Sequence, residues 1–150
     1  MDNVVSLIFS VLMIIAFWKI FTKAGEKGWK AIIPVYNAYT AYKLFWNKKM
    51  FWVTLVLGVV TAIVGCIGLG SLGVFAELGE GDGLAVAGVL FSILFVIMLI
   101  PLFILGIIYC SRMSKSFGHG AGFTVGLVFL NIIFVLILAF GKSEYKKIEG

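Results

Sequence analysis

Long apolar segments alternate with shorter polar ones along this chain. An α-helix rises about 1.5 Å per residue, so about 20 residues cross the ~30 Å hydrocarbon core of a bilayer. Four segments approach or exceed that length, and the one charged residue in them, Lys19, lies near a segment end, where a lysine can extend to the headgroups. The pattern predicts an all-α polytopic membrane protein, with one integral membrane domain and four transmembrane helices. These helices are expected at about residues 4–21, 51–69, 84–110 and 122–140.

The stretch between the first two segments mixes aromatic side chains with lysines. Its tyrosines and last tryptophan recur at spacings of three, three and four residues, which is one face of a helix. We expect a turn at Gly25–Gly28 and then an amphipathic helix over about residues 29–47 that lies in the membrane interface. Aromatic rings with a polar group prefer the headgroup level, and lysines attract anionic lipid. This segment is therefore either an anchor for the helix ends or a surface that binds lipid or a partner. The candidate surface consists of Lys23, Lys27, Trp29, Lys30, Pro34, Tyr36, Asn37, Tyr39, Tyr42, Lys43 and Trp46.

Composition agrees with the hydropathy pattern. Of the 150 residues, 62% are hydrophobic and 13% are charged, whereas a soluble domain has about a quarter charged residues. These values exclude a disordered chain, a disulfide-rich secreted module and a water-soluble enzyme. The formal net charge of +5 is explained by lipid headgroups, and nothing in the sequence suggests nucleic acid.

The distribution of charge predicts the orientation. With the N-terminus outside, the inner segments carry nine basic residues and the outer segments carry three, which fits the positive-inside rule. The three outer lysines all lie in the tail, residues 142–150. That tail faces outward if residues 122–140 span the membrane, and inward if they form a re-entrant segment. Both alternatives stay open at this point.

Small and polar residues inside the segments suggest contacts between helices. Small residues recur every fourth position in the second segment, which favours close packing against another segment or another copy of the chain. Asn131, near the middle of the fourth segment, is the one carboxamide in the four predicted spans, so we expect it to face protein or water. It either forms an interhelical hydrogen bond or provides a polar point in a path. The small-residue stripe consists of Thr54, Gly58, Ala62, Cys66 and Gly70.

Few residues could carry chemistry. The predicted spans contain no Asp, Glu or His, which argues against proton-coupled transport. Ser111 and Lys115 are four residues apart, but an exposed lysine keeps its proton at neutral pH and is a poor base. His119 has no second ligand at metal-binding spacing. We therefore expect no catalytic residues, no metal and no cofactor.

Three motifs carry a family resemblance. They are Phe-Thr-Lys-Ala-Gly-Glu-Lys-Gly-Trp-Lys-Ala-Ile-Ile-Pro-Val-Tyr-Asn at 21–37, Lys-Ser-Phe-Gly at 115–118 and Phe-Gly-Lys-Ser-Glu-Tyr at 140–145. Together they resemble a family of small bacterial inner-membrane proteins that carries a domain-of-unknown-function label. The resemblance implies a multi-pass protein of the bacterial cytoplasmic membrane, with no established activity to transfer.

The chain departs from that family in two ways. Its outer loop, residues 70–83, is longer, and Asn131 and Val135 stand where prolines are expected, which affects the path of the fourth segment. Members are often labelled signal peptidase I. The residues do not support that label, because the loop at 70–83 is too short for the large outer β-domain of those enzymes.

Three functional hypotheses follow from the sequence. The first is a non-enzymatic membrane protein that binds lipid, a membrane protein partner or a second copy through the basic surface and the small-residue stripe. The alternative is a small oligomeric channel or transporter with Asn131, Thr54 and Thr61 along its path. A membrane peptidase or hydrolase is the weakest of the three.

Overall fold

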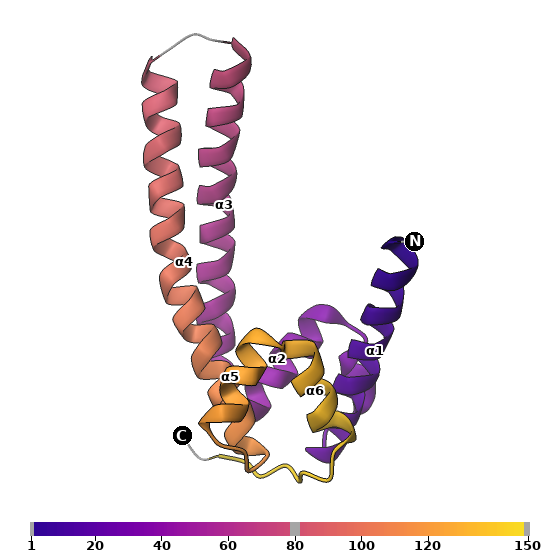
Figure 1. The fold of residues 1–150 in the computed structure, drawn as a ribbon. Helices are drawn as coiled ribbons and strands as arrows, with labels where there is room; N and C mark the ends of the chain where they lie inside the picture. Colours follow the sequence, from indigo (N-terminus) through magenta and orange to yellow (C-terminus); the bar gives the residue numbers. More distant parts are fainter. Residues whose placement is uncertain (1, 79–81, 149–150) are drawn as a thin grey trace. The chain divides into compact units, whose positions relative to one another are not determined.

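The computed structural model describes residues 2–78 and 82–148, and within these ranges it is entirely helical (Figure 1). The chain divides into two compact units. The first unit combines residues 1–51 with 106–150, and the second contains residues 52–105. In chain order the helices are α1 (Asp2–Lys23), the 3₁₀ helix η1 (Gly28–Ala31), α2 (Pro34–Phe45), α3 (Lys48–Leu78), α4 (Asp82–Ser116), α5 (Ala121–Phe129) and α6 (Asn131–Phe140).

Three helices in the described residues are long and apolar enough to cross a membrane. They comprise Val4–Lys23, Lys48–Val74 and Ala85–Ser116. The expectation of an all-helical fold with membrane-spanning helices is therefore confirmed for the described residues. α3 and α4 extend well beyond the predicted second and third segments, so helix replaces much of the loop expected at 70–83; residues 79–81 of that loop lie outside the described residues.

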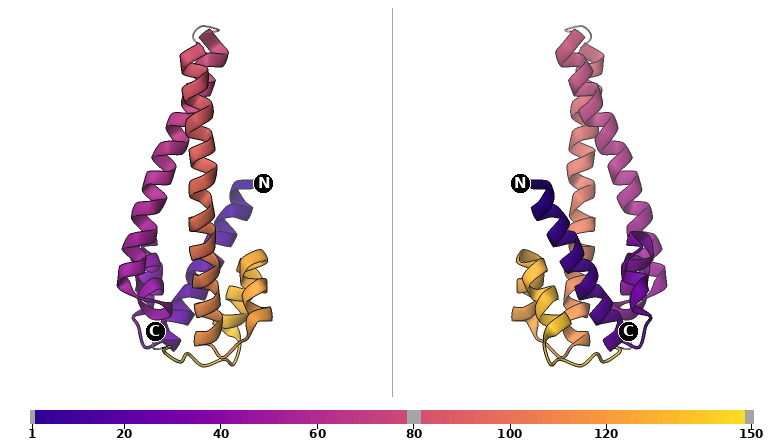
Figure 2. Two further views of the ribbon diagram at one scale, coloured as in Figure 1. Left: turned by 90° about the vertical axis from the view of Figure 1, so that its left-hand side faces the viewer. Right: turned by 90° about the vertical axis from the view of Figure 1, so that its right-hand side faces the viewer.

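The predicted fourth transmembrane helix, residues 122–140, is replaced by two short ones. α5 has nine residues and α6 has ten, and the chain bends between them at Leu130, which adopts φ −122° and ψ 46°. The two helices lie side by side in every view (Figure 2). Close packing joins them, because Gly126 leaves room for the ring of Phe134, which also contacts the ring of Phe123 at 4.8 Å. The described residues therefore contain three helices long enough to span a membrane, and the expected fourth is not among them.

The segment after α1 is likewise divided rather than continuous. The expected helix over 29–47 forms as η1 followed by α2, which begins at Pro34. Proline lacks a backbone N–H and its φ suits the first turn of a helix, so Pro34 favours the start of α2, where the missing N–H costs no helical hydrogen bond.

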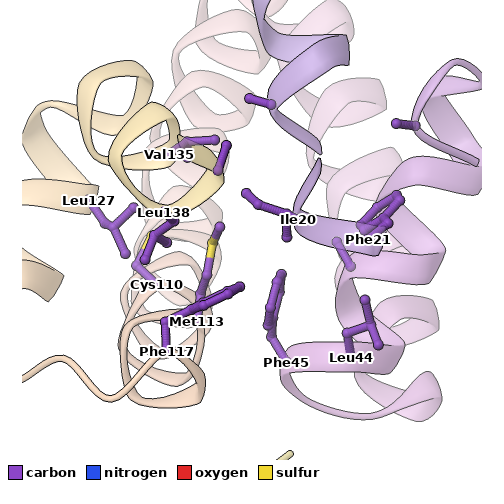
Figure 3. Close-up of a cluster of buried hydrophobic side chains, with 14 residues drawn as sticks. Ile20, Phe21, Leu44, Phe45, Cys110, Met113, Phe117, Leu127, Val135 and Leu138 are labelled. Atoms are coloured by element: carbon purple, nitrogen blue, oxygen red, sulfur yellow. The ribbon is translucent and has the colours of Figure 1, made fainter. Parts of the chain in front are cut away.

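One hydrophobic cluster holds the first unit together. α1, α2, the last turns of α4, and α5 and α6 all contribute side chains that face one another (Figure 3). Segments about 100 residues apart in sequence therefore share a core. Its largest buried members include Ile20, Phe21, Phe45, Met113, Phe117, Leu127, Val135 and Leu138.

In the second unit, α3 and α4 pack as an antiparallel pair. A side chain at Gly65 would overlap the ring of Phe95, and one at Gly68 would come within 2.9 Å of the backbone nitrogen of Ser92. The packed face therefore follows Gly65 and Gly68, whereas Ala62 on the predicted stripe is exposed. Four residues turn an α-helix by about 400°, so a stripe with that spacing drifts about 40° per step and leaves the packed face.

α1 ends in a Schellman motif built on a glycine. Gly25 has φ 77°, and the N–H of Glu26 donates to the carbonyl of Phe21 at 2.8 Å. The N–H of Gly25 donates to the carbonyl of Thr22 at 3.2 Å. These two bonds satisfy carbonyls that a helix end leaves free. The turn expected at Gly25 is therefore present.

α4 ends in the same way at Gly118, whose φ is 74°. The N–H of His119 donates to the carbonyl of Ser114 at 3.0 Å, and that of Gly118 donates to the carbonyl of Lys115 at 2.9 Å. Two of the three family-like motifs are therefore helix C-caps.

Replacing either capping glycine will destabilise the first unit. At Gly25 and Gly118 an added Cβ meets no atom within 4 Å, so the cost of Gly25→Ala or Gly118→Ala comes from the left-handed backbone, about 1–2 kcal/mol. Gly58→Ala is the matched control, because Gly58 is helical and equally uncrowded, and it should be neutral or slightly stabilising. In a Cys66→Ala background, the temperature at which the buried Cys110 reacts with a thiol dye measures stability. Equal melting temperatures for all three variants would contradict this account.

Candidate functional site

The lysine at the end of α1 binds the chain that follows α6. Lys23 Nζ donates to the carbonyl oxygens of Leu138 and Gly141, both at 2.7 Å, and to that of Ser143 at 3.4 Å. An ammonium group has three protons, and these carbonyls accept all three. Lys23 is thus occupied by backbone oxygens and joins the first family-like motif to the third.

The tail beyond α6 is attached at two further points. The Tyr145 hydroxyl donates to the carbonyl of Leu44 at 2.7 Å, and the N–H of Lys146 donates to the carbonyl of Ser116 at 2.7 Å. The Tyr145 ring packs against Phe117 at 5.9 Å and Phe45 at 6.2 Å. The tail therefore lies beside the C-terminal ends of α1, α2 and α4, and all three family-like motifs meet there.

A half-buried carboxylate neutralises part of the basic charge. Glu26, whose side chain is 16% exposed, pairs with Lys30 and Lys43, each at 2.5 Å. The hydrogen bonds from Lys30 and then Lys43 hold the pKa of Glu26 below its usual value, and the bond to Glu26 raises the pKa of Lys43. Burial, with a smaller contribution from Glu26, raises the pKa of Tyr145 and keeps its phenol protonated as a donor.

Aromatic side chains continue across the same surface. Trp29 stacks on Tyr36, with ring centroids 5.7 Å apart, and Tyr36 contacts Tyr39 at 6.2 Å. Further along, Tyr42 stacks on Trp46 at 6.4 Å, and the guanidinium of Arg112 lies 5.3 Å from the Trp46 ring. The aromatic row expected on one helix face is thus extended by Trp29 of η1, and Arg112 of α4 adds a cation to it.

A pocket of about 660 Å³ opens between α2, the start of α3 and the tail. Lys43, Lys48 and Lys147 line it, and Glu26 is the one acidic residue in its lining. Asn47 caps α3 there, since its Oδ1 accepts the N–H of Met50 at 2.8 Å. The remaining lining residues are Ala24, Leu44, Trp46, Asn47, Tyr145 and Ile148. Lysines and the positive end of a helix dipole together favour a negatively charged ligand.

The structure brings only some of the expected site residues together. Lys43 and Trp46 line the pocket, whereas Lys27 is exposed outside it and the Asn37 amide donates to the carbonyl of Ala31 at 3.3 Å. Thr54, Gly58 and Ala62 belong to the second unit, where the buried hydroxyl of Thr54 has no hydrogen-bond partner in the described part of the chain.

Several residues of the pocket were missed in the sequence. In the sequence, Asn47 ends the interfacial helix expected at 29–47 and Lys48 belongs to the basic stretch before the second span, while Tyr145 and Lys147 belong to a tail of undetermined side. The motif at 140–145 was the available signal for Tyr145, because a tyrosine within a polar tail needs a partner for its ring and its hydroxyl.

The serine-rich segment at the end of α4 has a structural role. The Ser114 hydroxyl donates to the carbonyl of Gly120 at 3.1 Å and that of Ser116 donates to Arg112 at 2.9 Å, while Lys115 is exposed. His119 stacks on Phe123 at 4.2 Å. In the described ranges, no group of three His, Cys, Asp or Glu residues could hold a metal ion.

These features define an all-helical protein with apolar helices long enough for a membrane and a basic, aromatic surface at their ends. The chain belongs to a family of unknown function (DUF5684), whose family model matches residues 29–100 and 91–147. This membership agrees with the resemblance to a family with a domain-of-unknown-function label. The searches of curated proteins and of solved structures found no match.

The Glu26 pairs predict a pH dependence. The pKa of Glu26 is lower in the folded chain, so its ionisation stabilises the fold above its unfolded pKa, and this contribution is lost as the pH falls through the folded pKa. Glu26→Gln should lower stability at pH 7 by up to about 1 kcal/mol, and the difference from wild type should vanish at low pH. Melting temperatures between pH 8 and pH 3 test this. Glu144→Gln, at an exposed carboxylate, is the control and should follow wild type; a Glu26→Gln difference that persists at low pH would count against the ion pairs.

Proposed function

We propose that this protein is a multi-pass protein of the bacterial cytoplasmic membrane, with its N-terminus outside, that binds anionic lipid headgroups at its inner face. The proposed binding site is the pocket lined by Lys43, Lys48 and Lys147. The observation that carries this proposal is the attachment of the tail, which brings Lys147 to a pocket formed at the ends of apolar helices. The role is one of binding, without catalysis.

Charge supports the proposed orientation. With the tail beside the C-terminal ends of α1 and α4, all twelve Lys and Arg residues belong to segments at one face of the membrane. Four of the seven acidic residues then belong to the other face, one near the N-terminus and three within residues 77–82, from the end of α3 to the start of α4. This separation is more complete than the nine against three of the four-span arrangement, and it matches the positive-inside rule.

The chemistry of the pocket supports a phosphate-bearing headgroup. Glu26 is engaged by Lys30 and Lys43, whereas the described residues include no salt bridge from Lys48 or Lys147. Two ammonium groups therefore remain for an anion, beside the capped start of α3. Trp46 and Tyr145, which also line the pocket, are residue types that prefer the headgroup level.

The orientation predicts opposite labelling of two single cysteines in a Cys66→Ala background. On intact cells, a membrane-impermeant maleimide should label Glu80→Cys, and it should label Lys27→Cys only after permeabilisation. The unmodified background protein reports any reaction of Cys110. The reverse pattern would contradict the orientation.

The lipid site predicts a loss of selectivity when its free lysines are removed. In liposomes, spin-labelled phosphatidylglycerol should be immobilised by the protein more than spin-labelled phosphatidylcholine, as measured by electron paramagnetic resonance. Lys48→Gln with Lys147→Gln should reduce this preference by about fivefold per lysine, since a basic residue at the surface contributes about 1 kcal/mol.

The matched control removes two exposed lysines outside the pocket, Lys27→Gln with Lys115→Gln. If both double variants lose the same selectivity, binding comes from the diffuse charge of the face and the pocket is not a site. If neither loses selectivity, lysines do not bind these headgroups.

A further inference from the structure

α5 and α6 form an uncharged hairpin whose tip is its most exposed part. The chain carries no charged residue from position 120 to position 141. At the bend Phe129 is 79% exposed, Leu130 is 54% exposed, and Ile133 one turn further is 53% exposed. Large apolar side chains gathered at a protruding turn are costly in water, and the absence of charge makes the whole hairpin compatible with hydrocarbon.

Three hydrogen bonds at the bend engage some of the backbone groups that a break between two helices leaves free. The N–H of Leu130 donates to the carbonyl of Gly126 at 2.7 Å, and the N–H of Phe134 donates to the carbonyl of Leu130 at 3.1 Å. The side-chain amide of Asn131 donates to the carbonyl of Leu127 at 3.1 Å. The one carboxamide of this apolar stretch thus forms a bond across the bend and does not point to a partner helix.

Contacts with α1 determine the position of α6 along the axis of α1. Lys19 Nζ lies 4.2 Å from the centre of the Phe140 ring, and Lys23 binds the carbonyls that close α6. Val135 faces Ile20 in the shared core (Figure 3). The C-terminal end of α6 therefore lies at the C-terminal end of α1, a helix long enough to cross the membrane. The N-terminal end of α6, at Asn131, lies further towards the α1 N-terminus, by at most the length of ten helical residues, about 15 Å.

Length limits the depth of that tip to about half the membrane thickness. Helices of nine and ten residues extend about 14–15 Å, against ~30 Å for the hydrocarbon core. The start of α5 follows the cap of α4 at Gly118, and the tail after α6 returns to Ser116 through the Lys146 N–H. Both ends of the hairpin therefore lie at one face, the face of the capped ends of α1 and α4.

We propose that α5 and α6 are a re-entrant hairpin that inserts into a single leaflet, on the side of Lys23, and that the acyl chains of that leaflet surround its exposed tip. Phe129, Leu130 and Ile133 contact the lipid near the bilayer centre, and the uncharged faces of both helices contact it along their length. This inference needs α1 to cross the membrane. It does not depend on the headgroup pocket, which can fail while the hairpin still inserts, and a hairpin that lies on the surface would leave the pocket intact.

Spin labels along the hairpin test the insertion in the full-length protein. In a Cys66→Ala background in liposomes, labels are attached at Lys115→Cys, Val125→Cys, Phe129→Cys and Lys142→Cys, all exposed positions. The ratio of accessibility to oxygen over accessibility to a water-soluble nickel chelate should be severalfold higher at Phe129→Cys than at Lys142→Cys, with Val125→Cys between them. The background protein shows whether Cys110 takes up label.

The side of each end is measured in vesicles of one orientation. A membrane-impermeant reductant added outside should reduce the labels at Lys115→Cys and Lys142→Cys together, or spare them together. Reduction of one and not the other means that residues 120–141 span the membrane and overturns the proposal. A label at Phe129→Cys as accessible to nickel as that at Lys142→Cys means that the hairpin lies on the surface, which also overturns it. Ile133→Cys repeats the tip measurement at a second exposed site.

Discussion

The ammonium group of Lys23 bound by three backbone carbonyls is the interaction on which the first unit depends. A helix leaves its last carbonyls without partners, and in an apolar environment each such group costs free energy. The bonds from Lys23 satisfy both partners. The carbonyl groups at the end of α6 receive hydrogen-bond donors, and the ammonium group of a lysine near hydrocarbon receives acceptors. Once this bond forms, α6 is held beside α1, and the tail must leave in the direction of Tyr145 and its partner on α2.

Much of the fold follows from the sequence because it depends on local properties. Hydropathy and length identify the helices that can span, and Gly25 marks a turn because a left-handed residue is needed after α1. The sequence left a re-entrant segment open as one of two alternatives, but the position of the break between α5 and α6 could not be predicted in this way. Neither proline nor charge marks it, and the chain at Leu130 bends because Phe134 finds space at Gly126 and because the Asn131 amide binds the Leu127 carbonyl.

The candidate site was predictable only in part, because it is formed by segments distant in sequence. The lysines and aromatic residues of 23–46 indicate a membrane interface. The pocket, however, also depends on Lys147, which is brought to the pocket by the bond of Tyr145 to Leu44, about 100 positions earlier in the sequence. The face of α3 that packs against α4 could likewise be predicted only in part. A stripe of small residues identifies a helix that can be approached closely, but the partner selects Gly65 and Gly68 and leaves Ala62 exposed.

The first unit is discontinuous in sequence, and this has a consequence for biosynthesis. Residues 1–51 leave the ribosome before residues 52–105, and their partners, residues 106–150, follow that segment. Pairings across such a separation form late, since the closure of a long loop precedes the contacts that stabilise it. The carbonyl groups that bind Lys23 are therefore synthesised 115 to 120 residues after Lys23 itself. Synthesis of residues 106–150, rather than insertion of the first helix, is the step that commits this unit to its folded state.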